Sequence, residues 1–485
     1  MSDLKSTLDR GLRGFSPSPQ ALERTLTLTD RWRRNRRIGT AALALIIAVA
    51  AIGGVFRAFR TAEAPQPGSQ QISRSNVSTL HVVGRGTFGG QPRSIAVADG
   101  RVYVQAKGGN DLTEFPADCA TSCDPVWVAD TGANHPVTPE FAPWAAGGIV
   151  YVGTDDLYAY SSTCGTGGAT CDPLWVGKVR GDATEPALGD GAVFVISLGG
   201  KLYRFPSSCD APDGVCRPDW VSATQPTNLF HPQVVGDSVV AQRFASPAYV
   251  AFPTSCAARS GCQPASTWAP PAGAVRTAVP TSAGGITYMG VTTGSGGELV
   301  AYPPSCATGG GHCSPSWTAR FTDEINAPPP IAADGKVFVG STVGGFLKAF
   351  PAECGAATCD PLWSATVQNL DWTHPAVTNG LVYAGSRDGG VYAFPTDCGT
   401  GDAVCKPAWT WGTAIDGAPV RIQAVAATGE RVYAISNDGD LYVFGPGRPP
   451  IAPASSGKRS APYVYAFLVA AIATGGVVLR RRRIG

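Results

Sequence analysis

Cysteine is the residue type in this chain whose number and spacing say most about chemistry. Fourteen cysteines form seven local pairs, and three to six residues separate the two members of each pair. Such pairs can form disulfides or supply thiolate ligands to a metal ion.

The disulfide interpretation fits better than the metal interpretation. A structural zinc site needs four ligands, so two thiolates per pair do not complete one. The variable loop length also suits a covalent clip better than a fixed coordination geometry. Because disulfides persist in oxidising compartments, we predict that this region lies outside the cytoplasm. The predicted bonds are Cys119–Cys123, Cys164–Cys171, Cys209–Cys216, Cys256–Cys262, Cys306–Cys313, Cys354–Cys359 and Cys398–Cys405.

Three of the five histidines lie near the start of a repeat, together with aromatic and acidic residues. Histidines can bind metal or act as acid–base groups, whereas a His-Pro pair also commonly forms a capped turn. Two of these histidines fall in repeats that are far apart, so we predict a binding surface and no metal site. The candidate residues are His135, Trp144, Glu185, His231, Asp371, Trp372 and His374.

No sequence signature of catalysis accompanies these residues. The chain has no G-x-S-x-G, H-E-x-x-H or Walker sequence. Asp-Gly segments such as residues 437–440 lack the spacing of a calcium loop and indicate tight turns. We therefore predict no catalytic, cofactor-binding or metal-binding residues, and expect no enzymatic activity.

A repeated unit positions all of these residues. Each unit has an aromatic residue four positions before its first Cys and a Trp after its second, and the first cysteines are 44 to 50 residues apart. Short Val-, Tyr- and Phe-rich runs separated by Asp-Gly or Gly-Gly predict hairpins. Four strands in about 45 residues fit one blade of a β-propeller.

The repeat resembles a known family. Segments 99–104, 334–339 and 439–444 read Asp-Gly-Arg-Val-Tyr-Val, Asp-Gly-Lys-Val-Phe-Val and Gly-Asp-Leu-Tyr-Val-Phe. They are similar to the quinoprotein-type (PQQ-binding-like) propeller repeat, over about 370 residues. The resemblance implies a toroid in which each repeat Trp docks between neighbouring blades. Here a Cys-bounded loop replaces the family's Thr-Gly turn.

The resemblance does not extend to the family's cofactor chemistry. Quinoprotein dehydrogenases have an adjacent Cys-Cys pair against the cofactor and acidic residues that hold calcium. No adjacent Cys-Cys pair occurs here. We therefore expect no cofactor, and a quinone-dependent (PQQ-type) dehydrogenase is the alternative.

The seven complete units are followed by a partial eighth, which begins at Gln423 and stops at Phe444. Residues 77–83 stand where its missing fourth strand would stand. We predict an all-β, eight-bladed propeller closed by this N-terminal strand, because closure leaves no exposed sheet edge. Seven blades with an additional hairpin is the alternative.

Two uncharged segments flank the propeller, and each is long enough to span a bilayer. Basic clusters at residues 31–37 and 480–483 place both termini in the cytoplasm. Cleavage of the first segment as a signal peptide after Ala64 is the alternative. The predicted order is a basic tail (1–37), a transmembrane helix (38–56), a linker (57–75), the propeller (76–446), a linker (447–460), a transmembrane helix (461–479) and a basic tail (480–485). This membrane-anchored arrangement resembles that of actinobacterial membrane proteins.

The predicted cytoplasmic tails are basic, and the segment between them is mildly acidic. The basic tails leave 25 basic and 32 acidic side chains between them, a net charge of about −7. A mildly acidic domain is not expected to bind nucleic acid.

The usual blade order predicts that both linkers leave the propeller at one face, the bottom face, together with the Cys hairpins. The opposite top face consists of loops that lead into the innermost strands, and such loops often carry function. We expect a non-catalytic scaffold or sensor that binds a protein or a cell-envelope component at the top face. A signal transducer that uses the N-terminal tail is a further alternative.

Overall fold

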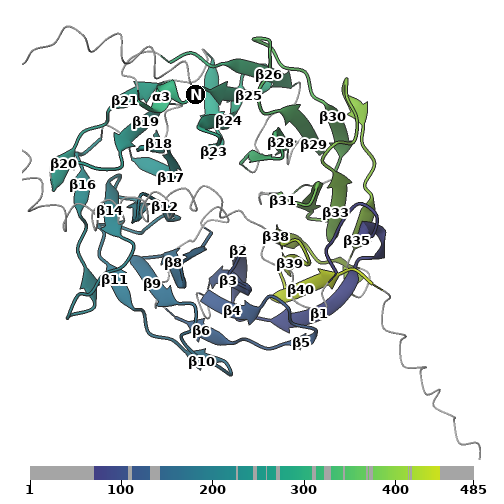
Figure 1. Cartoon of the computed structure of the whole chain (residues 1–485), viewed down its shortest axis with the longest axis horizontal. Helices are drawn as coiled ribbons and strands as arrows, with labels where there is room; N and C mark the ends of the chain where they lie inside the picture. The colour runs from purple at the N-terminus through teal and green to yellow at the C-terminus, as the bar shows by residue number, and fades with distance from the viewer. Residues whose placement is uncertain are drawn as a thin grey trace, which may run out of the picture.

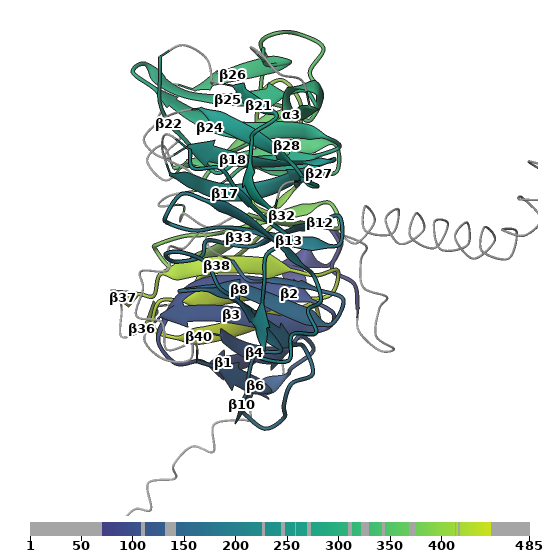
Figure 2. The ribbon, with the colours of Figure 1, turned by 90° about the vertical axis from the view of Figure 1, so that its left-hand side faces the viewer.

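The computed structural model describes a closed ring of eight small antiparallel sheets (Figure 1). The described residues are 70–107, 112–130, 142–225, 228–243, 248–257, 259–268, 273–308, 313–321, 329–341, 345–367, 370, 375–412, 414–415 and 418–447. Viewed edge-on, the ring is a disc (Figure 2). The prediction of an eight-bladed all-β propeller is therefore confirmed.

No helix in the described residues is long and apolar enough to cross a membrane. The predicted spans 38–56 and 461–479, with both tails and most of both linkers, lie outside these residues.

The blades are numbered 1 to 8 along the chain, and each has four antiparallel strands counted from the ring centre. The innermost strands are β2 (Gln91–Ala98), β7 (Trp144–Ala146), β12 (Ala187–Gly189), β17 (Leu229–Val235), β22 (Ala274–Thr277) with β23 (Thr281–Ala283), β27 (Ile331–Ala333), β31 (Ala376–Thr378) and β38 (Ile422–Ala427). The second strands are β3 (Arg101–Lys107), β8 (Ile149–Gly153), β13 (Ala192–Ile196), β18 (Ser238–Arg243), β24 (Ile286–Thr293), β28 (Lys336–Ser341), β32 (Leu381–Gly385) and β39 (Val432–Ser436).

The outer half of each blade contains the Trp repeat. The third strands are β4 (Leu112–Pro116), β9 (Leu157–Ser161), β14 (Leu202–Pro206), β19 (Tyr249–Pro253), β25 (Gly296–Tyr302), β29 (Phe346–Pro351), β33 (Gly390–Pro395) and β40 (Asp440–Gly445). The fourth strands are β6 (Trp127–Ala129), β11 (Trp175–Gly177), β16 (Trp220–Ser222), β21 (Ser266–Trp268), β26 (Trp317–Phe321), β30 (Trp363–Thr366), β35 (Trp409–Gly412) and, for blade 8, β1 (His81–Thr87).

The remaining elements lie in loops. Strands of the Cys hairpins are β5 (Thr121–Cys123), β10 (Ala169–Thr170), β15 (Val215–Cys216), β20 (Ser260–Cys262) and β34 (Ala403–Val404). The hairpin of blade 5 instead contains a short helix, α3 (Ser305–Thr308), and a small hairpin of β36 (Ala414–Ile415) and β37 (Ala418–Pro419) follows β35.

The N-terminal strand closes the ring, as predicted, but it begins later than predicted. β1 pairs with β40 of blade 8. Residues Val77–Thr79 form a 3-10 turn instead of the start of this strand. The physical reason is packing, since the buried side chains of Val77 and Leu80 join an apolar cluster with Trp409 of blade 7.

The repeat tryptophans join neighbouring blades. Trp127 contacts the ring of Tyr160 in the next blade at a centroid distance of 5.9 Å. Trp363 lies 6.2 Å from Phe394 of the next blade, and its indole N–H donates to the backbone carbonyl of Thr396 at 3.0 Å. The expectation from the resemblance, that the Trp docks between blades, is confirmed.

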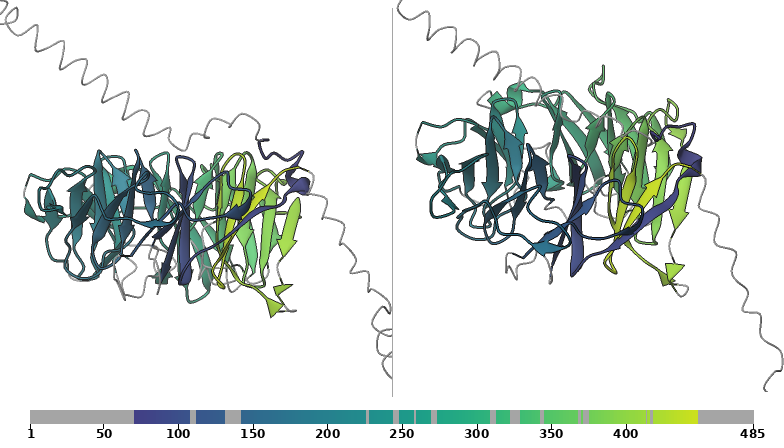
Figure 3. Two further views of the ribbon diagram at one scale, coloured as in Figure 1. Left: turned by 90° about the horizontal axis from the view of Figure 1, so that it is seen from below. Right: turned by 60° about the horizontal axis from the view of Figure 1, so that its bottom comes forward.

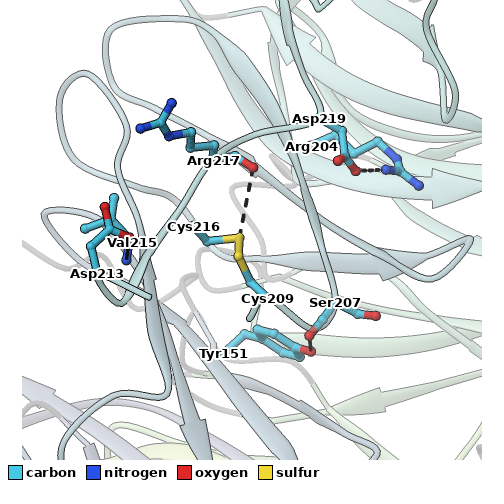
Figure 4. The surroundings of a disulfide bond; sticks show 9 residues. All are labelled: Tyr151, Arg204, Ser207, Cys209, Asp213, Val215, Cys216, Arg217 and Asp219. Carbon is cyan, nitrogen blue, oxygen red and sulfur yellow. Dashed lines mark hydrogen bonds and ion pairs between the residues drawn. A yellow bond between two sulfur atoms is a disulfide. The ribbon is translucent and has the colours of Figure 1, made fainter. Parts of the chain in front are cut away.

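All seven predicted disulfides are present. Figure 4 shows the one formed by Cys209 and Cys216 in blade 3. Nearby, the hydroxyl of Tyr151 from blade 2 donates to the backbone carbonyl of Ser207 at 2.6 Å, so the base of the hairpin is also attached to the preceding blade.

These hairpins add a fifth strand to the neighbouring sheet, which the sequence pattern did not predict. β10 of blade 2 pairs in parallel with β6 of blade 1, and β15, β20, β34 and β5 do the same on β11, β16, β30 and β1. Each of these hairpins therefore connects its own blade to the preceding one.

Candidate binding face

The two faces of the ring are distinguished by strand direction. The third strand of blade 8 ends beside the start of β1, because Gly445 is the ladder partner of His81. Both described ends of the chain therefore leave at one face, the bottom face, where the third strands end and the Cys hairpins begin. Figure 3 shows the β36–β37 hairpin projecting at the opposite, top face.

The top face places two of the predicted residues in direct contact. Nδ1 of His231 in blade 4 lies 2.5 Å from Oε1 of Glu185 in blade 3, and both side chains are buried. Since a carboxylate can only accept, the imidazole donates this hydrogen bond when the carboxyl is ionised. The bond links the starts of two adjacent innermost strands.

The local backbone explains how His231 reaches its partner. The pairing of β17 with β18 slips between Phe230 and Gln233, which is a β-bulge. His231 has a φ of 54° in this bulge, a conformation uncommon for residues other than glycine. Bulges commonly redirect a side chain, and here the imidazole is directed to the neighbouring blade.

Trp144 is the predicted residue that the structure places on the surface. It begins β7, and 45% of its area is exposed. His135, Asp371, Trp372 and His374 lie outside the described residues, so their place on the top face stays a prediction.

The described residues of this face include one buried ionisable pair and one exposed aromatic side chain. Among the described residues, no three His, Cys, Asp or Glu side chains gather as a metal site. The Glu185–His231 pair is buried, which indicates a structural link between blades. The exposed indole of Trp144 offers a large apolar surface with a hydrogen-bond donor, a combination typical of binding hot spots.

A second ionisable pair was missed by the sequence analysis. Glu114 in β4 is fully buried, and Arg101 Nη1 lies 2.6 Å from its Oε1. Burial raises the pKa of Glu114 to about 7, and Arg101 opposes this rise. The signal was present in the repeat, because most blades have alanine before the anchoring aromatic residue where blade 1 has Glu114.

A surface hollow lies on the outer rim. A cavity of about 540 Å³ is bordered by residues of the blade 3 hairpin, including Asp210, Asp213 and Arg217. It is open and formed by the disulfide loop itself, so it does not extend the top-face site.

Comparisons with known proteins agree with this architecture. Residues 295–447 match a family model described as outer membrane protein assembly factor BamB. No curated protein matches the sequence significantly.

Two solved structures show the same fold at low sequence identity. The computationally designed protein Ika8 is 13% identical with a TM-score of 0.56, covering 75% of this chain and 99% of its own. BamB from Moraxella catarrhalis is 16% identical with a TM-score of 0.51, covering 76% of this chain and 98% of its own. The chain thus has the fold of a β-propeller, and its residues 295–447 match a model of the PQQ-like repeat.

Proposed function

We propose that this protein is a membrane-anchored, extracytoplasmic propeller whose top face binds a protein partner or a cell-envelope component. The observation that carries the proposal is the pairing of His81 with Gly445 at the bottom face. Linkers that leave from adjacent points on one face would hold that face toward the bilayer and present the top face to partners.

Three further features support this proposal. Seven disulfides, each within one hairpin, suit an oxidising compartment. Flanking uncharged segments with cytoplasmic-type basic clusters suit two membrane anchors. The similar protein BamB is named as an assembly factor, which favours a scaffold over an enzyme.

The proposal is tested by substitution of Trp144, the exposed aromatic of the top face. The full chain, its Trp144→Ala variant and a Leu174→Ala control are each crosslinked in cell membranes, and crosslinked proteins are quantified by mass spectrometry. Leu174 is a matched control, because it is 51% exposed but follows the Cys hairpin at the bottom face.

We expect Trp144→Ala to weaken partner binding about thirtyfold, the factor that corresponds to about 2 kcal/mol at a hot spot. A crosslinked species that is lost in Trp144→Ala and retained in Leu174→Ala supports the top face as the binding surface. Equal recovery from both variants would contradict the assignment.

A further inference from the structure

The outer edge of a fourth strand has the same hydrogen-bonding pattern in several blades. The residue after the repeat Trp turns its backbone N–H and C=O away from the ring. In blade 5 the N–H of Thr318 donates to Ala357 at 2.9 Å, and its C=O accepts from Cys359 at 2.8 Å. In blade 6 the C=O of Ser364 accepts from Cys405 at 2.8 Å. At these edges, the hydrogen-bonding partners of the fourth strand are backbone groups in the hairpin of the following blade.

Blade 7 differs from these blades, because blade 8 has no Cys hairpin to cover it. The sheet of blade 7 has four strands and ends at β35. The sheet of blade 4 also ends at its fourth strand, β21, but there the hairpin of blade 5 lies beside the strand, and the Ser266 hydroxyl donates to the backbone carbonyl of Cys306 at 3.0 Å. Thr410 follows Trp409 and is exposed. In the part of the chain that the structure describes, no hydrogen bond from another element to the backbone N–H or C=O of Thr410 is found on the outward side.

The register of β35 matches that of the covered strands. The N–H of Ala408 donates to Ala393 at 2.8 Å, as the N–H of Leu362 does to Ala349 at 2.7 Å in blade 6. Thr410 therefore corresponds to Ser364 and presents its N–H and C=O outward in the same way.

The N-terminal segment replaces only the buried part of the missing hairpin. The backbone carbonyl of Leu80 accepts a hydrogen bond from the indole N–H of Trp409 at 2.9 Å. Val77 and Leu80 fill the apolar space beside this Trp. β1 then passes to blade 8, so the backbone edge of β35 receives no strand from this segment.

We propose that the outward edge of β35 binds an extended segment of a partner protein as a parallel fifth strand. Open strand edges are templates for such pairing, which is a common mode of peptide recognition. The site is separate from the top-face surface and does not depend on it.

The strands that cover the other edges indicate what kind of segment fits. They are two or three residues long and consist of small or β-branched residues, as in Ala403–Val404 and Thr121–Cys123. Their backbone N–H groups are used, since the N–H of Ala403 donates to the carbonyl of Leu362 at 3.3 Å and that of the following Cys405 to Ser364 at 2.8 Å. The partner segment should thus run in the direction of β35, contain small or β-branched residues, and lack proline at the paired positions.

The probe for a test is a linear peptide that copies residues 399–406 with the substitution Cys405→Ala. This sequence covers the edge of β30 in blade 6, so its backbone suits the equivalent edge of β35. Amide hydrogen exchange of the full chain in detergent is measured with and without the peptide. We expect slower exchange in the segment that contains Thr410 when the peptide is present.

The decisive variant is Thr410→Pro, which removes the outward N–H while leaving the pairing with β33 in place, since proline is tolerated where the N–H faces solvent. We expect it to weaken peptide binding about tenfold or more, as loss of a paired donor would. The control Thr410→Val changes the side chain, keeps the N–H and should bind as the unmodified protein does.

Two results would overturn the proposal. One is equal peptide binding by Thr410→Pro and the unmodified protein. The other is full protection of the Thr410 segment without peptide, which would mean that a linker of this chain or a second copy already fills the edge. Trp144→Ala should leave peptide binding unchanged, so failure of the top-face proposal is distinguishable from failure of this one.

Discussion

Glu114 illustrates how one buried side chain makes the stability of the ring depend on pH. Its pKa is raised from 4.5 to about 7, chiefly by burial. Because the folded state keeps this proton to a higher pH than the unfolded state, the group's contribution to stability falls as pH rises from about 4.5 to about 7. The contribution is fully present below this range.

We therefore predict that Glu114→Gln removes part of the pH dependence of folding. The free energy of unfolding is measured by denaturant titration at intervals from about pH 5 to about pH 8. The unmodified protein should lose stability relative to the variant over this range, by at most a few kcal/mol, since one pKa unit corresponds to about 1.4 kcal/mol. If the unfolding free energies of the two proteins change equally with pH, the prediction is wrong, and Arg101 keeps the Glu114 carboxylate ionised in the folded protein.

The sequence predicted the disulfides but not the contact between buried ionisable residues. The disulfides were predictable because their partners are close in the chain and repeat with a fixed plan. The Glu185–His231 contact was not predicted, although both residues occupy the same position in consecutive repeats. Its geometry depends on the bulge at His231, which local sequence patterns do not reveal.

The closing strand is the element that departs most from the repeat. In β35, Trp409 pairs with Ala393, the residue before the anchoring Phe394. In β1, Gly84 pairs with the corresponding residue Val443. Gly84 thus occupies the position in blade 8 that the repeat Trp occupies in the other blades. A Cβ atom added at Gly84 would lie 2.8 Å from the sulfur of Cys123.

This close approach predicts that Gly84→Ala destabilises the ring. The added methyl group would also meet the backbone carbonyl oxygen of Cys119 at 2.9 Å, so the disulfide loop would have to shift. We expect a loss of about 1 to 3 kcal/mol, typical of overpacking, measured by thermal or denaturant unfolding. Gly412→Ala is the matched control, because a Cβ there meets nothing within 4 Å. Equal losses in both variants would contradict the packing argument.

For the strands as elements, the repeat predicted where each strand lies but not that the Cys hairpins pair with the preceding sheet. Three-dimensional adjacency of blades decides that β10 and β34 extend the preceding sheets, and the spacing of cysteines does not contain this information. The beginning of β1 was also misplaced, because the apolar residues Val77 and Leu80 fit a strand pattern but pack in a turn against blade 7.

For the whole molecule, the repeat topology was the feature from which most of the fold could be predicted. The blade count, the closure by an N-terminal strand and the exit of both described ends at one face follow from four antiparallel strands per repeat. The contacts of the top face could not be predicted in the same way, since loops are not fixed by the repeat.

A local disulfide in each of blades 1 to 7 is the central feature of the ring, and it implies an oxidising compartment. The most direct measurement is peptide mapping by mass spectrometry of the protein purified from membranes under non-reducing conditions with free thiols blocked. We predict seven linked peptide pairs, each within one hairpin, and no blocked cysteine. Free thiols in most blades, or links between cysteines of different hairpins, would contradict both the proposed compartment and the structural role of the hairpins.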